Sequence, residues 1–264
     1  MQKAIAIIVV IAIVAVIAWA LWRADEPEPL PEPQPTQEAP PAPPVTPPEP
    51  IESTPTKPPQ QPEPEPEVTV PPLQESDAFV RERLEPMNLP EPWLEQGDYA
   101  RRLAVLAENA TRGEYPRRQL AFLAPRGPFQ VTERNDRIFV DPQSYDRYDR
   151  YVEQLESVDP QRLAGLLDTI DPLVEEALAE VGVQAPPGQV FEAAIEEVLA
   201  VPVLEGDGSV ELVQPNVMYH YADPELESLS PLKKQVLRMG PENVQRLQTY
   251  LRRLAREMNL DVET

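Results

Sequence analysis

The sequence predicts a mainly α-helical protein with two small β-hairpins, forming a single globular domain behind a transmembrane helix and a proline-rich stalk. Three observations lead to this expectation. An uncharged apolar run opens the 264-residue chain, most of its 36 prolines follow in one stretch, and apolar residues then recur at helical spacing. These changes divide the chain into an anchor at 1–23, a linker at 24–72 and a helical domain at 73–264.

The anchor is predicted from residues 4–22, nineteen consecutive residues without a charge. About twenty apolar residues, rising ~1.5 Å each, span a hydrocarbon core of roughly 30 Å. Trp19 and Trp22 lie at its far end, and tryptophan prefers the membrane interface. A cleaved signal peptide is the alternative, because Ala18, Trp19 and Ala20 form a small-x-small site before Leu21. The run exceeds the usual 7–15 apolar residues or so of a signal peptide, which favours a retained anchor.

The orientation of this anchor depends on few charges. Lys3 precedes the apolar run and Arg23 follows it, so the positive-inside signal is weak. A short N-terminal tail is easily retained inside. We therefore expect a cytoplasmic N-terminus and a globular domain outside the cytoplasm.

The linker, residues 24–72, holds twenty prolines, ten acidic residues and a single lysine, Lys57. Such a segment has too few apolar residues to form a core. Proline restricts the backbone to extended polyproline II geometry, which makes a semi-rigid spacer reaching on the order of 150 Å when fully extended. A docking track for an SH3-like domain is the alternative. It is less favoured because a single basic residue, Lys57, accompanies the P-x-x-P steps.

Helices are predicted along the domain from capping residues and apolar spacing. Ser76 is placed as an N-cap, Asp159 and Asp171 each precede a proline at a helix start, and Gly182 ends a helix. The final helix has an apolar stripe made of Val244, Leu247, Leu251, Leu254 and Met258. The predicted helical segments are 76–84, 98–113, 144–158, 159–182, 188–200, 223–229, 230–240 and 241–259.

Two hairpins are predicted between these helices. Residues 128–140 alternate around Arg134 and Asn135, and residues 201–213 turn at Asp207 and Gly208. Residues 216–221 continue the second of these strands.

Composition excludes several kinds of chemistry. The chain has no cysteine, so it has no disulfide, thiolate nucleophile or cysteine metal site. Its net charge of −22 repels phosphate backbones, so we expect no nucleic-acid partner. His220 is the single histidine, and no recognised catalytic motif is present. We therefore expect no cofactor, no metal site and no catalytic residue, and hence a protein that is not an enzyme.

A run of tyrosines is the first candidate interaction surface. Tyr145, Tyr148 and Tyr151 are spaced by three residues, and Arg147 lies between the first two. On a helix these rings form one stripe, which either stacks on a partner or packs into the core. Helical spacing favours the core.

The second candidate is the stretch that contains Arg238, Gly240, Pro241, Glu242 and Asn243. Glycine suits the left-handed end of one helix, and proline suits the first position of the next. Glutamate then meets the positive helix terminus, and the arginine is expected to bond across the turn. A structural corner explains each residue, whereas an active-site loop is the alternative.

Several strings in this order, "SDAFVRERL", "GPFQV", "DPQSYDRYDRYV", "DPLVEEAL" and "YADPELESLSPLKKQVLRMGPEN", resemble an uncharacterised bacterial membrane-anchored family, the domain of unknown function 3014. The resemblance covers about residues 72–251. It implies a gram-negative envelope protein, with one span in the inner membrane and a periplasmic domain. It implies no activity, substrate or catalytic residue.

Two functions are compatible with these observations. The first is a non-enzymatic interaction or scaffold domain, held off the inner membrane by its stalk, with an envelope protein or cell-wall component as partner. The second is a cell-envelope hydrolase that uses a carboxylate pair, with Asp146, Asp149 and Glu153 as candidate acids. A hydrolase predicts two carboxylates in one pocket, one of them with a raised pKa. The absence of familiar catalytic groups favours the interaction domain.

Overall fold

The computed structural model describes residues 69–89, 94, 96–117, 125 and 127–262. The predicted anchor lies outside these residues, as does the predicted linker apart from its last four residues. Within the described ranges, no helix is both long enough and apolar enough to span a membrane.

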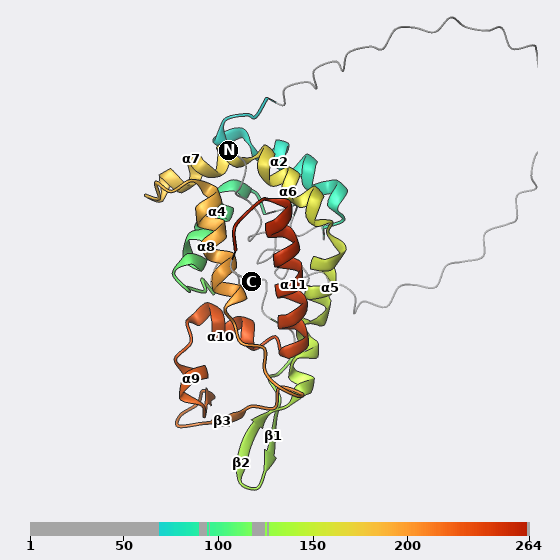
Figure 1. Cartoon of the computed structure of the whole chain (residues 1–264), viewed down its shortest axis with the longest axis vertical. Helices are drawn as coiled ribbons and strands as arrows, with labels where there is room; N and C mark the ends of the chain where they lie inside the picture. Colours follow the sequence, from blue (N-terminus) through green and yellow to red (C-terminus); the bar gives the residue numbers. More distant parts are fainter. Residues whose placement is uncertain (1–68, 90–93, 95, 118–124, 126, 263–264) are drawn as a thin grey trace, which may run out of the picture. The chain divides into compact units, whose positions relative to one another are not determined.

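Helices make up most of the described domain, as the apolar spacing predicts. Its nine α-helices are α2 (Asp77–Leu84), α4 (Tyr99–Thr111), α5 (Asp149–Ser157), α6 (Pro160–Thr169), α7 (Asp171–Glu180), α8 (Pro187–Leu199), α9 (Pro224–Glu227), α10 (Pro231–Leu237) and α11 (Pro241–Glu257). The described strands are β1 (Val131–Arg134), β2 (Arg137–Val140), β3 (Glu211–Val213) and β4 (His220–Tyr221). Figure 1 shows β1 and β2 at the end of the domain opposite α2 and α7.

Helix α11 is the central element of the core and contacts α5, α6, α8 and α10. The predicted apolar stripe is confirmed, since each of its five members is at most 5% exposed. Burying one such side chain stabilises a fold by roughly 1.5–3 kcal/mol. On the same helix, the hydroxyl of Tyr250 donates to the carbonyl of Val158 at 3.1 Å. The stripe therefore holds the bundle together, while polar tips satisfy carbonyls at its edge.

Helix α4 packs against both α7 and α8, and small side chains permit this. Ala100, Ala104, Ala107 and Ala110 are each at most 1% exposed. Residues three or four apart share one face of a helix, so these alanines form a narrow strip. The strip allows the neighbouring helices to approach closely.

The four described strands form a single antiparallel sheet, in the order β1-β2-β3-β4. Ile138 of β2 pairs with Leu212 of β3, which pairs in turn with Tyr221 of β4. Leu212 and Tyr221 are both buried, so the residues that pair β3 with β4 also contribute side chains to the core. The first hairpin turns at Asn135 and Asp136, both with positive φ, one residue later than predicted.

The predicted turn of the second hairpin is wrong. Residues 201–204 form no strand, and β3 pairs with β4 across residues 214–219 instead. Gly208 has a φ of +73°, and its carbonyl accepts a bond of 2.7 Å from the Tyr145 hydroxyl. A tertiary contact therefore uses the glycine that the local pattern assigns to a hairpin.

The segment with the three tyrosines is not one continuous helix. Two 3-10 turns, Pro142–Ser144 and Asp146–Tyr148, precede α5. Asp141 begins the first turn by accepting a bond from the N–H of Gln143 at 2.9 Å. The predicted helix start near residue 144 is therefore five residues early, because short-range bonds compete with the α-helix there.

Helix starts depend on contacts that the sequence does not reveal. Ser76 precedes α2 but makes no capping bond, because its hydroxyl donates to the Leu73 carbonyl at 2.8 Å. Asp159 caps α6 as predicted, accepting from the N–H of Gln161 at 2.9 Å. Asp171 is the first residue of α7 rather than its cap, because only Ile170 separates α7 from α6.

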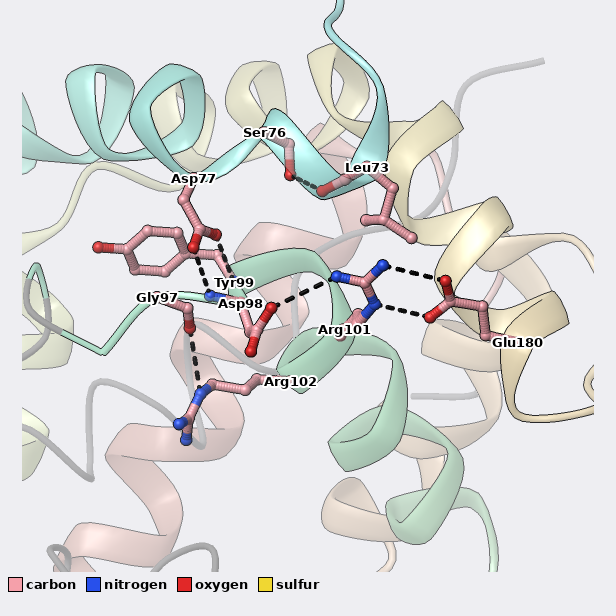
Figure 2. A network of polar contacts seen from close by, with 9 residues as sticks. All are labelled: Leu73, Ser76, Asp77, Gly97, Asp98, Tyr99, Arg101, Arg102 and Glu180. Atoms are coloured by element: carbon pink, nitrogen blue, oxygen red, sulfur yellow. Dashed lines mark hydrogen bonds and ion pairs between the residues drawn. The ribbon is translucent and has the colours of Figure 1, made fainter.

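A network around the start of α4 joins three helices (Figure 2). Asp77 of α2 accepts bonds from the backbone N–H of Asp98 at 2.9 Å and of Tyr99 at 3.3 Å. Arg101 of α4 donates two bonds, of 2.7 and 3.0 Å, to Glu180 of α7. We call these five residues the cap network. It caps α4 from a helix 22 residues earlier in the chain.

Candidate functional site

The corner between α10 and α11 brings the last helix against the tyrosine segment. Gly240 has a φ of +84°, in the region that favours glycine. A Cβ atom added there would lie 2.3 Å from Cγ of Tyr145. Pro241 is the first residue of α11 and Glu242 lies in its first turn, where the helix dipole favours a negative charge. Glycine is therefore required here both by the backbone and by the neighbouring ring.

Asn243 ties this corner to the tyrosine segment. Its side chain is 2% exposed, and its amide nitrogen donates to the carbonyls of Met239 at 3.1 Å and Tyr145 at 3.4 Å. The same nitrogen donates to Oδ1 of Asp149 at 2.7 Å. Three acceptors around the nitrogen determine how the amide is turned. The amide oxygen, Oδ1, is buried and has no hydrogen-bond partner among the described residues.

Arg238 does not make the bond across the turn that the sequence predicts. Its half-buried side chain has neither a hydrogen bond nor an ion pair with a described residue. Its charge acts instead on nearby tyrosines: burial raises the pKa of Tyr221 to about 12, and Arg238 opposes that rise. The corner is thus held by Gly240, Pro241 and Asn243, without the arginine.

A pocket of about 460 Å³ opens at this corner. Its walls come from three separate parts of the chain, within residues 142–149, 203–207 and 239–245. We call it the corner pocket. A volume of this size suits a small ligand or one or two side chains of a partner.

The walls of the corner pocket combine carboxylates with apolar side chains. Four acids line it, and no lysine, arginine or histidine is among the lining residues. None of the four forms an ion pair with a described residue. The acids are Asp146, Asp149, Asp207 and Glu242, and the apolar walls include Pro142, Val203, Leu204, Met239 and Pro241.

The carboxyl groups with shifted pKa values differ in place and direction. A hydrogen bond from the backbone N–H of Ser209 lowers the pKa of Asp207, which lines the pocket, and Arg134 adds to this effect. Burial raises the pKa of Asp171 to about 6, with contributions from the charges of Glu175 and Asp168. Asp171 begins α7 and is not among the residues that line the corner pocket.

The tyrosines of the first candidate surface are part of the core. Tyr145, Tyr148 and Tyr151 are 8%, 4% and 1% exposed, so their rings offer no surface to a partner. Burying three large rings lowers the free energy of the fold more than keeping their hydroxyls in water would. Arg147 is half-buried, donates to the Ser144 carbonyl at 2.7 Å and lies 5.7 Å from the centre of the Phe129 ring. Only Tyr145 reaches the corner pocket, as part of its wall.

Sequence reasoning missed the loop that completes the pocket. The sequence pattern predicts a hairpin for this loop, which includes Val203, Leu204 and Asp207. Only the Gly-Asp-Gly pattern indicates that the loop contains tight turns. Among the described residues, no group of three or more His, Cys, Asp or Glu side chains is arranged to hold a metal ion.

The comparison with family models covers part of this domain. A model described as "Protein of unknown function (DUF3014)" matches residues 99–255. Every residue that lines the corner pocket lies inside this match. No curated protein and no solved structure matches the chain.

Proposed function

The chain belongs to the DUF3014 family of proteins of unknown function, and from its own geometry we propose that it is an interaction domain that binds a partner molecule in the corner pocket. The observation that carries this proposal is a concave, acid-lined surface built from three parts of the chain. Binding sites are commonly concave, with apolar walls and a few polar groups that orient the ligand.

The packing around the pocket makes it a preformed site. Gly240 lies directly against Tyr145, and Gly208 approaches both Tyr145 and Pro241 so closely that a Cβ atom would lie 2.7 Å from Cδ of Pro241. The Tyr145 hydroxyl bonds the Gly208 carbonyl at 2.7 Å. A preformed pocket loses little conformational entropy on binding, which favours affinity.

In this proposal the domain acts at a distance from a membrane. Residues 4–22 anchor it in the inner membrane of a bacterium, with the N-terminus in the cytoplasm, and residues 24–72 hold it away in the periplasm. The sequence supports this through the uncharged apolar run and the twenty prolines that follow. The partner is then an envelope protein or a component of the cell wall.

The hydrolase alternative receives less support from the geometry. A carboxylate-pair hydrolase needs one acid with a raised pKa beside a second carboxylate in the same pocket. The carboxyl group raised to about 6 is that of Asp171, which lies outside the corner pocket. The pKa of Asp207, which lies inside it, is lowered.

Photo-crosslinking in intact cells tests the interaction domain. Val203 lines the pocket and is 43% exposed, whereas Val181 follows α7, is 47% exposed and does not line the pocket. A photoreactive amino acid at residue 203 should capture one partner that residue 181 does not capture. Identical capture from both positions, or no capture from residue 203, would contradict the proposal.

A further inference from the structure

We infer that the corner pocket receives an organic cation carried on an aliphatic stem, such as the ammonium group of a lysine side chain presented by a partner. This inference rests on the proposed function, since it names the chemistry that the same pocket recognises. It follows from three features of the pocket: the sign of its charge, an acceptor that lacks a donor, and the apolar walls beside the acids.

The charge of the pocket has one sign. Four carboxylates line it without a basic residue, and none forms an ion pair with a described residue. Carboxylates gathered in a concave surface focus a negative potential that attracts cations and repels anions. Asp146 and Glu242 are exposed and Asp149 is half-buried, so a ligand meets these three groups at different depths.

Asn243 supplies an independent sign that a donor is missing. It lines the pocket and is 2% exposed, yet its Oδ1 has no hydrogen-bond partner among the described residues. Buried polar atoms are almost always bonded, so an orphaned acceptor on a residue that lines the pocket calls for a donor. An ammonium or guanidinium group offers several N–H donors and no acceptor, which suits a pocket whose polar lining consists mainly of hydrogen-bond acceptors.

The apolar walls indicate the stem of the ligand. Val203, Leu204, Met239 and Pro241 line the pocket together with the carboxylates. Lysine and arginine side chains bury their methylene groups along apolar surface and keep the charge at its edge. A small inorganic cation would gain nothing from these walls.

A divalent metal ion fits the pocket less well than an organic cation. Calcium takes six to eight oxygen ligands at short distance. Among the described residues, no three carboxylate or histidine side chains are grouped so that they could hold a metal ion.

The test compares two probes that differ only by the ammonium group: Nα-acetyl-lysine methylamide and its neutral analogue Nα-acetyl-norleucine methylamide. Each is titrated into the purified full chain, and binding is followed by NMR chemical shifts. We expect the lysine probe to bind at least tenfold more tightly than the norleucine probe. We also expect its affinity to fall as salt is added, because the attraction is electrostatic.

Matched variants locate the binding. Asp146→Asn with Glu242→Gln removes two exposed charges from the pocket, and Glu153→Gln with Glu176→Gln removes two exposed charges elsewhere. The first pair should weaken the lysine probe at least tenfold, and the second pair should change its affinity less than twofold. Thermal unfolding checks that each variant is folded; the single substitutions serve if a double variant is not.

The outcomes separate this inference from the proposed function. Equal binding of the two probes, no binding of the lysine probe, or binding of Ca²⁺ in its place would overturn the organic cation. Specific crosslinking from residue 203 would still support the interaction domain in each of these cases. Loss of that crosslinking would remove the proposed function itself.

Discussion

The cap network and the corner pocket treat their carboxylates in opposite ways. In the cap network, Asp77 accepts two backbone N–H bonds and Glu180 receives a two-bond contact from Arg101. In the corner pocket, the four acids have no ion-pair partner among the described residues, although Asp149 accepts a bond from Asn243 and Asp207 accepts one from the N–H of Ser209. Figure 2 shows the first arrangement, in which each of the acids drawn has a donor.

This difference distinguishes the acids of the cap network, which stabilise the fold, from the acids of the corner pocket, which are available to a ligand. A carboxylate that accepts hydrogen bonds or faces arginine is favourable, whereas unpaired carboxylates in one place repel each other. The chain has a net charge of −22, so its acids outnumber its bases overall. An ion pair between an acid and an arginine is nevertheless found at the start of α4, whereas the acids of the pocket form none with a described residue. This difference supports a binding role for the pocket.

The largest effect is expected at Gly240, where the corner pocket meets the tyrosine segment. Gly240→Ala adds a Cβ atom 2.3 Å from the Tyr145 ring at a φ of +84°. The backbone strain and the clash together should lower the free energy of unfolding by about 3 kcal/mol. Urea denaturation measures this loss.

Gly182 provides the control for that substitution. Its φ is +85°, but a Cβ atom there would meet nothing within 4 Å. Gly182→Ala should therefore lower the free energy of unfolding by only about 1 kcal/mol, from the backbone alone. Equal losses at the two glycines would show that contact with Tyr145 does not constrain the corner.

The next effect is expected at Asn243, the amide that links the pocket to α5. Asn243→Ala removes the donor from two carbonyls and from Asp149, and should lower the free energy of unfolding by about 2 kcal/mol. Gln245→Ala, an exposed change on the same pocket wall, should cost less than about 0.5 kcal/mol. A loss at residue 243 no greater than at residue 245 would argue against a structural role for this amide.

A smaller effect is expected in the cap network. Asp77→Ala removes the cap of α4 and should lower the free energy of unfolding by about 1 kcal/mol. Glu82→Ala changes an exposed acid on the same helix and should stay within about 0.5 kcal/mol of the parent chain. Amide hydrogen exchange should also rise at the N–H groups of Asp98 and Tyr99 in the first variant only. Unchanged exchange there would contradict the capping role of Asp77.

The smallest effect concerns Asp171, a half-buried acid whose pKa is raised to about 6. Below about pH 4 the carboxyl is protonated in the folded and unfolded chains alike, so it has no effect on the pH dependence of stability. Between about pH 4 and 6 the unfolded chain ionises first, and stability falls as the pH rises. Asp171→Asn should remove this fall and add up to about 1 kcal/mol at pH 7, after allowance for solvent screening.

Urea denaturation at several pH values checks that expectation. The difference between the Asp171→Asn variant and the parent chain should vanish near pH 3 and reach its full size above pH 6. A difference that does not change with pH would mean that the ionisation of Asp171 is not its cause.

The helices could be predicted well from local rules, because helix formation depends on a few neighbouring residues. The stripe of α11 recurs every three or four positions, and its burial follows from that spacing alone. Asp159 with Pro160, and Gly240 with Pro241, mark helix starts because their backbone preferences are set within one turn. The mainly helical class of the domain could therefore be predicted from the sequence.

The same rules failed where distant segments compete for a residue. Gly208 suits a hairpin turn by itself, but in the fold it lies against Tyr145, 63 residues earlier. Asp77 opens its own helix, yet its carboxylate caps α4. Tyr148 falls in a 3-10 turn and Tyr145 lies between the two such turns, because bonds within the segment compete with the helix.

The sequence by itself determined the mainly helical class of the domain, the buried stripe of its last helix, and the need for glycine and proline at residues 240 and 241. Each of these follows from composition, from periodicity, or from the backbone restrictions of single residues. Only the tertiary structure decided that two hairpins become one sheet and that the corner becomes the wall of a pocket. Asn243 and Asp149, whose side chains meet there, are 94 residues apart. Their contact is set by the packing of α11 against α5, which no local pattern encodes.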